Sequence, residues 1–275
     1  MNVQRLASFT RNGEGGNPAG VVLCDTLPDA EQMQDVAAQV GYSETAFAAP
    51  TPDGFRVRYF APEAEVPFCG HATIALGAAL GAAHGAGAYQ LELNEASISV
   101  TAYEEDGAWG AQLVSPSTSW AAPDPALKAD ALALFGLVED DLDPSVPPAM
   151  VHGGAQHLVI ALARHGLLQT MVYDFDAGAA LMQAHGLVTI NLIWREAPDR
   201  IHSRNAFAGH GVYEDPATGA AAAALAGYLR DAHDQDAPFE VLQGAEAGHP
   251  SRLYVAAQTG QGAAVDVSGT VRQMG

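Results

Sequence analysis

A short turn in the first half of the chain, CGHAT, places Cys69 and His71 two residues apart, directly before a run of small apolar residues. A thiol and an imidazole can each give or take a proton, and a thiol at the start of a helix loses its proton more readily. Structural roles are the alternative, because a single cysteine is often a small buried side chain and a single histidine is often a hydrogen-bonded core or capping residue.

A second turn, EDPATG, supplies Asp215, Thr218 and Gly219 before another alanine-rich run. Both runs are predicted helices, so both turns lie at helix N-termini, where free N–H groups and a partial positive charge bind a carboxylate or an enolate oxygen. An acid, a proline and a threonine are also what an ordinary helix cap prefers. The residue types alone therefore leave anion binding and capping both open.

Glu44, in GYSETAF, is the third candidate. It follows a predicted helix and begins an apolar strand, and apolar surroundings favour the protonated form of a carboxylate. Such a residue suits general acid/base catalysis. An ordinary glutamate at the edge of a strand is the alternative.

The elements that must position these residues come in two similar sets. Residues 29–41 predict a helix that ends at Gly41, and residues 72–83 and 218–229 predict two helices of small residues that strands can approach closely. Aligning Gly70–Leu80 with Asp215–Leu225 gives six identities in eleven, four of them alanine, which suggests a duplication.

A stretch rich in Ser, Pro and Ala between Ser115 and Pro125 indicates a domain junction. We therefore predict an α+β protein of two similar halves, residues 1–117 and 118–275, with a last strand that could complete the first half. Each half is expected to be a mixed β-sheet rolled round its central small-residue helix.

The composition excludes several classes of protein. A formal net charge of −20 disfavours nucleic acid and anionic membrane surfaces as partners. The apolar runs fall short of the ~20 residues of a membrane span, and two distant cysteines indicate neither a disulfide framework nor a zinc knuckle. Because no histidine pair has the spacing of metal ligands, we expect no metal site, and we expect a cytoplasmic protein.

Five blocks spread over nearly the whole chain carry a resemblance to a known family. They are GNPAGVVL (Gly16–Leu23), GYSETAF (Gly41–Phe47), RYFAPEAEVPFCGHAT (Arg58–Thr73), GGAQHLVI (Gly153–Ile160) and YEDPATGAA (Tyr213–Ala221). In this order and spacing, the chain resembles the PhzF-type phenazine biosynthesis family of isomerases.

The resemblance implies a diaminopimelate-epimerase-like fold with an active-site cleft between the two domains, a homodimer, a small-molecule substrate and no cofactor. It also implies proton transfer on a substrate such as trans-2,3-dihydro-3-hydroxyanthranilate. The family's acid/base glutamate matches Glu44, its histidine matches His71 and its aspartate matches Asp215. Gly70, Cys69, Thr218, Gly219 and Ala220 are the expected substrate-binding positions.

Two departures from the family pattern leave alternatives open. The family resemblance implies a substrate-binding serine directly after DPATG, but this chain has Ala220 there. An alanine side chain cannot make that hydrogen bond. A non-catalytic, small-molecule-binding protein is therefore one alternative. Cys69 beside a helix N-terminus allows another, an amino-acid epimerase or racemase that uses Glu44 and Cys69 as its two bases.

Overall fold

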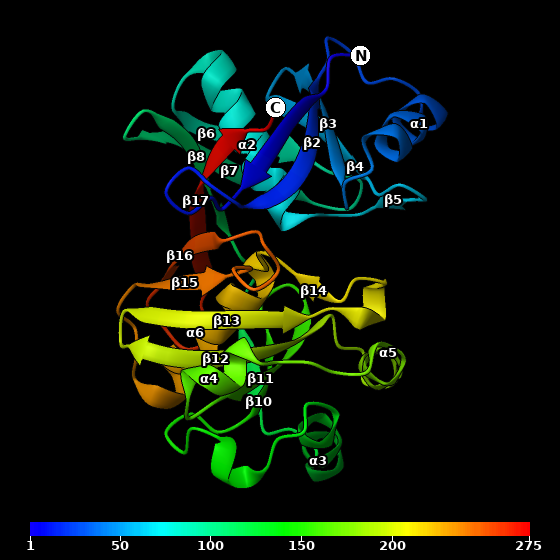
Figure 1. Ribbon diagram of the computed structural model, residues 1–275. Coiled ribbons are helices and arrows are strands. Elements are labelled where there is room, and N and C mark those ends of the chain that lie inside the picture. Colours follow the sequence, from blue (N-terminus) through cyan, green and yellow to red (C-terminus); the bar gives the residue numbers. More distant parts are fainter. The chain divides into compact units, whose positions relative to one another are not determined.

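The computed structural model describes residues 1–275, which divide into two units whose strands belong to one 17-stranded sheet (Figure 1). The first unit holds Met1–Val114 and Ser268–Gly275, and the second holds Ser115–Val267. The last strand, β17 (Val265–Gln273), begins in the second unit and ends in the first. The sequence analysis placed the boundary after residue 117.

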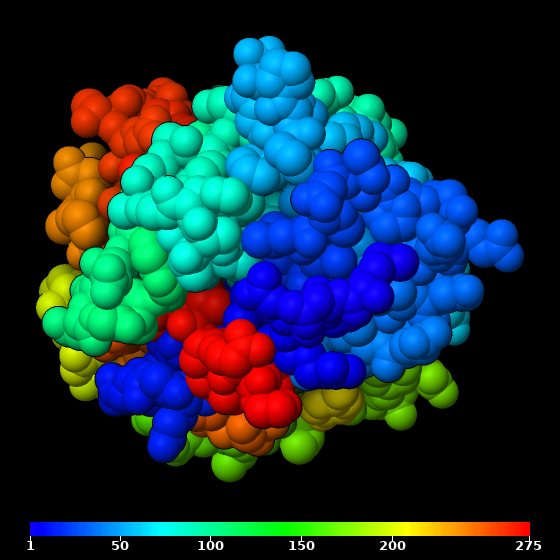
Figure 2. Space-filling model, turned by 90° about the horizontal axis from the view of Figure 1, so that it is seen from above, coloured from blue at the N-terminus to red at the C-terminus, as the bar shows by residue number.

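The first unit is built on eight strands and the end of a ninth. The eight are β1 (Gln4–Ser8), β2 (Asn17–Leu23), β3 (Thr45–Thr51), β4 (Gly54–Phe60), β5 (Glu65–Val66), β6 (Gly87–Glu92), β7 (Ser97–Glu105) and β8 (Ala108–Val114). Of these, β2 and β3 are buried along most of their length. The β2–β3 and β4–β6 pairs are parallel, and the pairs β1–β2, β3–β4, β4–β5, β6–β7 and β7–β8 are antiparallel. The end of β17 adds to β1, so the C-terminal residues lie against the N-terminal ones (Figure 2).

Two helices complete the first unit. The predicted helix at residues 29–41 is confirmed as α1 (Ala30–Val40). The Asp29 side chain caps its N-terminus by accepting a hydrogen bond from the Gln32 N–H, and Gly41 ends the helix in the left-handed conformation at φ 71°. The central helix α2 (Gly70–His84) packs against six strands, because most of its buried residues are alanine or glycine. Gly77 illustrates the packing: a Cβ there would lie 2.6 Å from Val100 and 2.7 Å from Ala111.

The second unit follows the same plan. Its strands are β9 (Ser119–Ala121), β10 (Ala149–His152), β11 (Gln156–Ala161), β12 (Thr189–Ala197), β13 (Arg200–Ala206), β14 (Glu214–Asp215), β15 (Phe239–Gln243) and β16 (Ser251–Ala257). Its helices are α3 (Pro125–Leu134), η1 (Glu139–Asp141), α4 (His165–Gln169), α5 (Phe175–Ala184), η2 (Ala208–His210) and the central α6 (Gly219–His233).

The two units share one order of pairing. In the second unit β11–β12 and β13–β15 are parallel and β10–β11, β12–β13, β13–β14 and β15–β16 are antiparallel, which repeats β1 to β7 strand for strand. In each unit an arginine of the longer strand pairs with a glutamate of the short strand that precedes the central helix: Arg58 with Glu65, and Arg204 with Glu214. The prediction of two similar halves is confirmed.

The register of the repeat differs from the one predicted. Both central helices begin at a glycine, Gly70 and Gly219, so the residues correspond at an offset of 149, and not at the offset of 145 that pairs Gly70 with Asp215. The paired glutamates, Glu65 and Glu214, have this same offset. The predicted alignment was therefore wrong by four residues, because alanine-rich helices match one another at any shift of about one turn.

The longest helices, α2 and α6, hold 15 residues each. None of the helices combines the length and the hydropathy that a membrane-crossing helix requires.

Candidate active site

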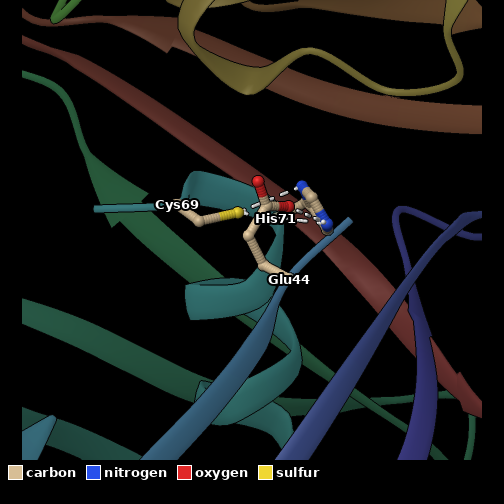
Figure 3. A group of neighbouring side chains, drawn as sticks. All are labelled: Glu44, Cys69 and His71. Carbon is tan, nitrogen blue, oxygen red and sulfur yellow. Dashed lines mark hydrogen bonds and ion pairs between the residues drawn. The ribbon is translucent and has the colours of Figure 1, made fainter. Parts of the chain in front are cut away.

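Three of the predicted site residues lie together in the first unit. The Nε2 atom of His71 lies 3.4 Å from Oε2 of Glu44, and the Nδ1 atom of the same ring lies 3.3 Å from Sγ of Cys69. The side chains point toward one another at the start of α2 (Figure 3). One ligand atom from each residue, a carboxylate oxygen, a sulfur and a ring nitrogen, lies within 4.8 Å of the other two.

The local fold explains why they meet. α1 ends at Gly41, and the chain enters β3 at Thr45, so Glu44 lies at the mouth of a strand that runs parallel to β2. The carbonyl of Glu44 accepts a hydrogen bond from the Gly20 N–H at 3.1 Å, which fixes the backbone at this point. Cys69 is the N-terminal cap of α2, and its extended backbone turns the chain into the helix.

The turn that carries Cys69 and His71 is held from three sides. The Thr73 hydroxyl donates to the Cys69 carbonyl at 2.7 Å, and the buried Tyr59 hydroxyl lies 2.7 Å from the same threonine oxygen. The hydroxyl of Ser8, which is fully buried, donates to the His71 carbonyl at 2.7 Å. Because the backbone is fixed at both residues, the thiol and the imidazole are positioned before any ligand arrives.

Burial differs within the Glu44 side chain. The side chain as a whole is 21% exposed, and that of His71 is 11% exposed, yet Oε2 of Glu44 is buried and has no hydrogen-bond partner. The His71 ring beside it is charged only when protonated. A carboxylate oxygen of this kind is free to accept a proton from a bound molecule.

Sequence reasoning missed two hydroxyls beside this group. Ser43 Oγ lies 3.3 Å from Nε2 of His71, so it shares that nitrogen with Glu44. Ser8 supports the His71 backbone, as described above. Ser43 could have been noticed because it precedes Glu44 directly, whereas nothing in the sequence around Ser8 indicates its contact.

The other predicted residues lie in the second unit, at the start of α6. The Thr218 hydroxyl donates to Oδ2 of Asp215 at 2.6 Å, and Gly219 and Ala220 are the first two residues of the helix. Gln243, on β15, was not predicted. Its amide donates to the Asp215 carbonyl at 2.6 Å and to the Thr218 hydroxyl at 3.0 Å, and its oxygen accepts from the Thr218 N–H at 3.2 Å.

The Asp215 turn is therefore a folded hydrogen-bonded unit in which one buried glutamine satisfies both the backbone and the hydroxyl of the cap. At the offset of the repeat, Ala220 corresponds to His71 and Thr218 corresponds to Cys69. The start of α2 thus carries a thiol and an imidazole where the start of α6 carries a hydroxyl and a methyl group.

Comparisons with known proteins identify the family of the chain. The profile of the PhzC-PhzF family, described as phenazine biosynthesis-like protein, matches residues 6–273. A trans-2,3-dihydro-3-hydroxyanthranilate isomerase of Pseudomonas aeruginosa is 32% identical over 96% of this chain and 94% of its own length. The enzyme of the same name from Pseudomonas fluorescens is 33% identical over 88% of this chain and 85% of its own length.

A solved structure supports the fold. The phenazine biosynthesis protein of the PhzF family from Bacillus anthracis superposes with a TM-score of 0.87 over 100% of this chain and 98% of its own, at 23% identity. This likeness confirms the predicted fold class, and the names of the relatives confirm the predicted enzyme class, an isomerase. Since the family profile covers nearly every residue, the chain belongs to the PhzC-PhzF, phenazine biosynthesis-like family.

Proposed function

We propose that the protein is a cofactor-independent isomerase that moves a proton on a small, carboxylate-bearing, amino-acid-like substrate, including cyclic ones, with Glu44 as the acid/base. The observation that carries the proposal is the Oε2 atom of Glu44, which is buried, lacks a hydrogen-bond partner and lies 3.4 Å from the imidazole of His71. An oxygen in this state can take a proton from a C–H bond and return it to another carbon of the same molecule.

The neighbouring groups have separate tasks in this proposal. The first N–H groups of α2, from Gly70 onward, bind the substrate carboxylate or the negative charge that develops as the proton leaves. His71 accepts or donates a hydrogen bond beside the reacting carbon, and Ser43 orients its ring. From the family resemblance, Asp215 binds the substrate's amino group, and a homodimer is the proposed assembly.

The substrate named by the relatives is the first one to test. Proton NMR in D₂O with trans-2,3-dihydro-3-hydroxyanthranilate and a panel of amino and hydroxy acids detects solvent deuterium that enters a carbon position. Glu44→Gln should abolish the exchange, and Glu63→Gln, an exposed glutamate of the loop between β4 and β5, is the matched control. Saturable binding without exchange in any compound would support a non-catalytic, small-molecule-binding protein instead.

The epimerase alternative has less support from the geometry. An epimerase removes a proton from one face of a carbon and returns a proton to the other face. It therefore needs two bases about 6 Å apart, because each base must lie at about 3 Å from that carbon. The Cys69 and Glu44 ligand atoms lie within 4.8 Å of each other. Cys69→Ser should therefore retain most of the exchange catalysed by Glu44, and a complete loss would favour the two-base mechanism.

A further inference from the structure

We propose that Glu44, Cys69 and His71 form a binding site for a thiophilic divalent cation of the zinc class, and that the bound ion blocks the acid/base group. The three side chains offer a carboxylate oxygen, a thiolate sulfur and an imidazole nitrogen, each a preferred zinc ligand. Metal binding does not depend on the proposed isomerase function, whereas the block of activity rests on it.

The distances suit a small tetrahedral ion. With metal–sulfur bonds of about 2.3 Å and metal–nitrogen and metal–oxygen bonds of about 2.0 Å, the ligand atoms of a tetrahedral site lie about 3.3 to 3.5 Å apart. His71 Nε2 lies 3.4 Å from Glu44 Oε2 and 3.9 Å from Cys69 Sγ. The sulfur, the carboxylate oxygen and the ring nitrogen lie within 4.8 Å of one another, so the side chains must close by up to about 1.3 Å, and the fourth position stays open for water.

The charges of the ligands also select the ion. A thiolate and a carboxylate together neutralise a divalent cation, and the imidazole binds it in its neutral form. When the ion binds, the S–H bond of Cys69 breaks, a sulfur–metal bond forms and the proton goes to the buffer. The partial positive charge at the start of α2 opposes a cation, but it also favours the thiolate of Cys69, which is the stronger ligand.

The ligand set excludes the harder ions. Calcium takes six to eight oxygen ligands and magnesium prefers an octahedron of oxygens, and this site offers a single carboxylate. The site is also preformed, because Thr73 and Ser8 fix the backbone of Cys69 and His71. Preformed ligands lose little conformational freedom when the ion binds.

The consequence for catalysis is direct. An ion bound to Oε2 of Glu44 occupies the lone pair that must accept the substrate proton, and it fixes His71 in its neutral form. Zinc at one equivalent should therefore inhibit proton exchange, and a chelator should restore it.

The test uses the whole chain and cobalt as a spectroscopic probe for the zinc site. Titration with Co²⁺ should give a thiolate-to-cobalt charge-transfer band that saturates at one equivalent and disappears when Zn²⁺ is added. Cys69→Ser should remove the band, and Glu44→Gln should weaken binding at least ten-fold. Cys24→Ser, which removes the other cysteine, is the matched control and should leave the band unchanged.

Each outcome decides the proposal. A saturable band that depends on Cys69 supports the site, and no band, or one that depends on Cys24, overturns it. Circular dichroism checks that each variant is folded, so that loss of the band reports ligation. If the band forms and zinc leaves proton exchange unchanged, the inhibitory part is overturned, and if no substrate exchanges at all, the proposed function fails while the cation site stands.

Discussion

His157 on β11 is a buried titratable group of the second unit whose protonation state should set part of the protein's stability in acid. It is fully buried, and its Nδ1 atom lies 2.8 Å from the Thr189 hydroxyl oxygen. That hydroxyl gives its own proton to Oδ1 of Asn205 at 2.7 Å, so Nδ1 of the histidine must be the N–H donor. The remaining nitrogen, Nε2, has no hydrogen-bond partner, and a proton on it would be buried and unpaired.

The magnitude follows from linkage. Burial, together with the charge of His152, lowers the pKa of His157 from its ordinary value of 6.5 to about 3. Above pH 6.5 the ring is neutral in both the folded and the unfolded chain, and its full contribution to stability is present. As the pH falls from 6.5 toward about 3, the ring takes up a proton in the unfolded chain only, so the folded state loses stability. At about 1.4 kcal/mol per pH unit, the free energy of unfolding should fall by about 3 kcal/mol between about pH 7 and about pH 4 from this residue alone.

The assay compares urea unfolding of the wild type and of His157→Asn across this range of pH. The asparagine amide can still donate to Thr189, so the variant removes the titrating ring and keeps the hydrogen bond. The smaller side chain leaves a cavity and lowers stability at every pH by about 1 to 3 kcal/mol. On acidification the wild type should lose about 3 kcal/mol more than this variant, which cancels or reverses the difference seen at neutral pH, whereas the exposed His185→Asn should run parallel to the wild type. Parallel curves for His157→Asn would refute the reasoning.

Three further predictions concern the two repeats and the substrate. Glu214→Gln leaves its buried arginine partner, 7% exposed, without a counter-charge and should cost about 3 to 5 kcal/mol in urea unfolding, whereas Glu65→Gln, in the more exposed pair, should cost about 1 kcal/mol or less. Gly77→Ala should destabilise the chain by about 1 to 3 kcal/mol in the same assay because its Cβ would overlap β7 and β8, and Gly166→Ala, which meets nothing within 4 Å, should be neutral. Ala220→Ser should improve the specificity constant for dihydrohydroxyanthranilate about five-fold through one hydrogen bond of about 1 kcal/mol, and an unchanged constant in steady-state kinetics would count against a substrate contact there.

Local signals predicted much of the fold. The helix at residues 29–41 was predictable because Asp29 and Gly41 are capping residues at its two ends. The sequence analysis does not predict helix α3, because Pro125 belongs to the stretch that it interprets as a domain junction. In the structure Asp124 caps this helix and the proline occupies its first turn, where no N–H is needed.

The residues of the site could be predicted from the sequence, but their positions relative to one another could not. Glu44, Cys69 and His71 were each identified, but the spacing of residues along the chain does not show that their ligand atoms meet. Their ligand atoms meet because β3 and α2 come together in the folded unit, and such a contact has no periodic signal in the sequence. The role of Gln243 could not be predicted for the same reason, since this residue lies 25 positions beyond Thr218, whose turn it supports.

The path of β17 has a consequence for how this chain could be rearranged. Because its last residues add to β1, with the Met274 N–H bonded to the Arg5 carbonyl at 2.8 Å, the two ends of the chain lie next to each other in the first unit. A circular permutant with residue 275 linked to residue 1 and new ends opened between Val114 and Ser115 would make both units continuous in sequence, one after the other. In that order the unit that carries Glu44 could be truncated away or produced alone, which the natural order of the chain does not allow.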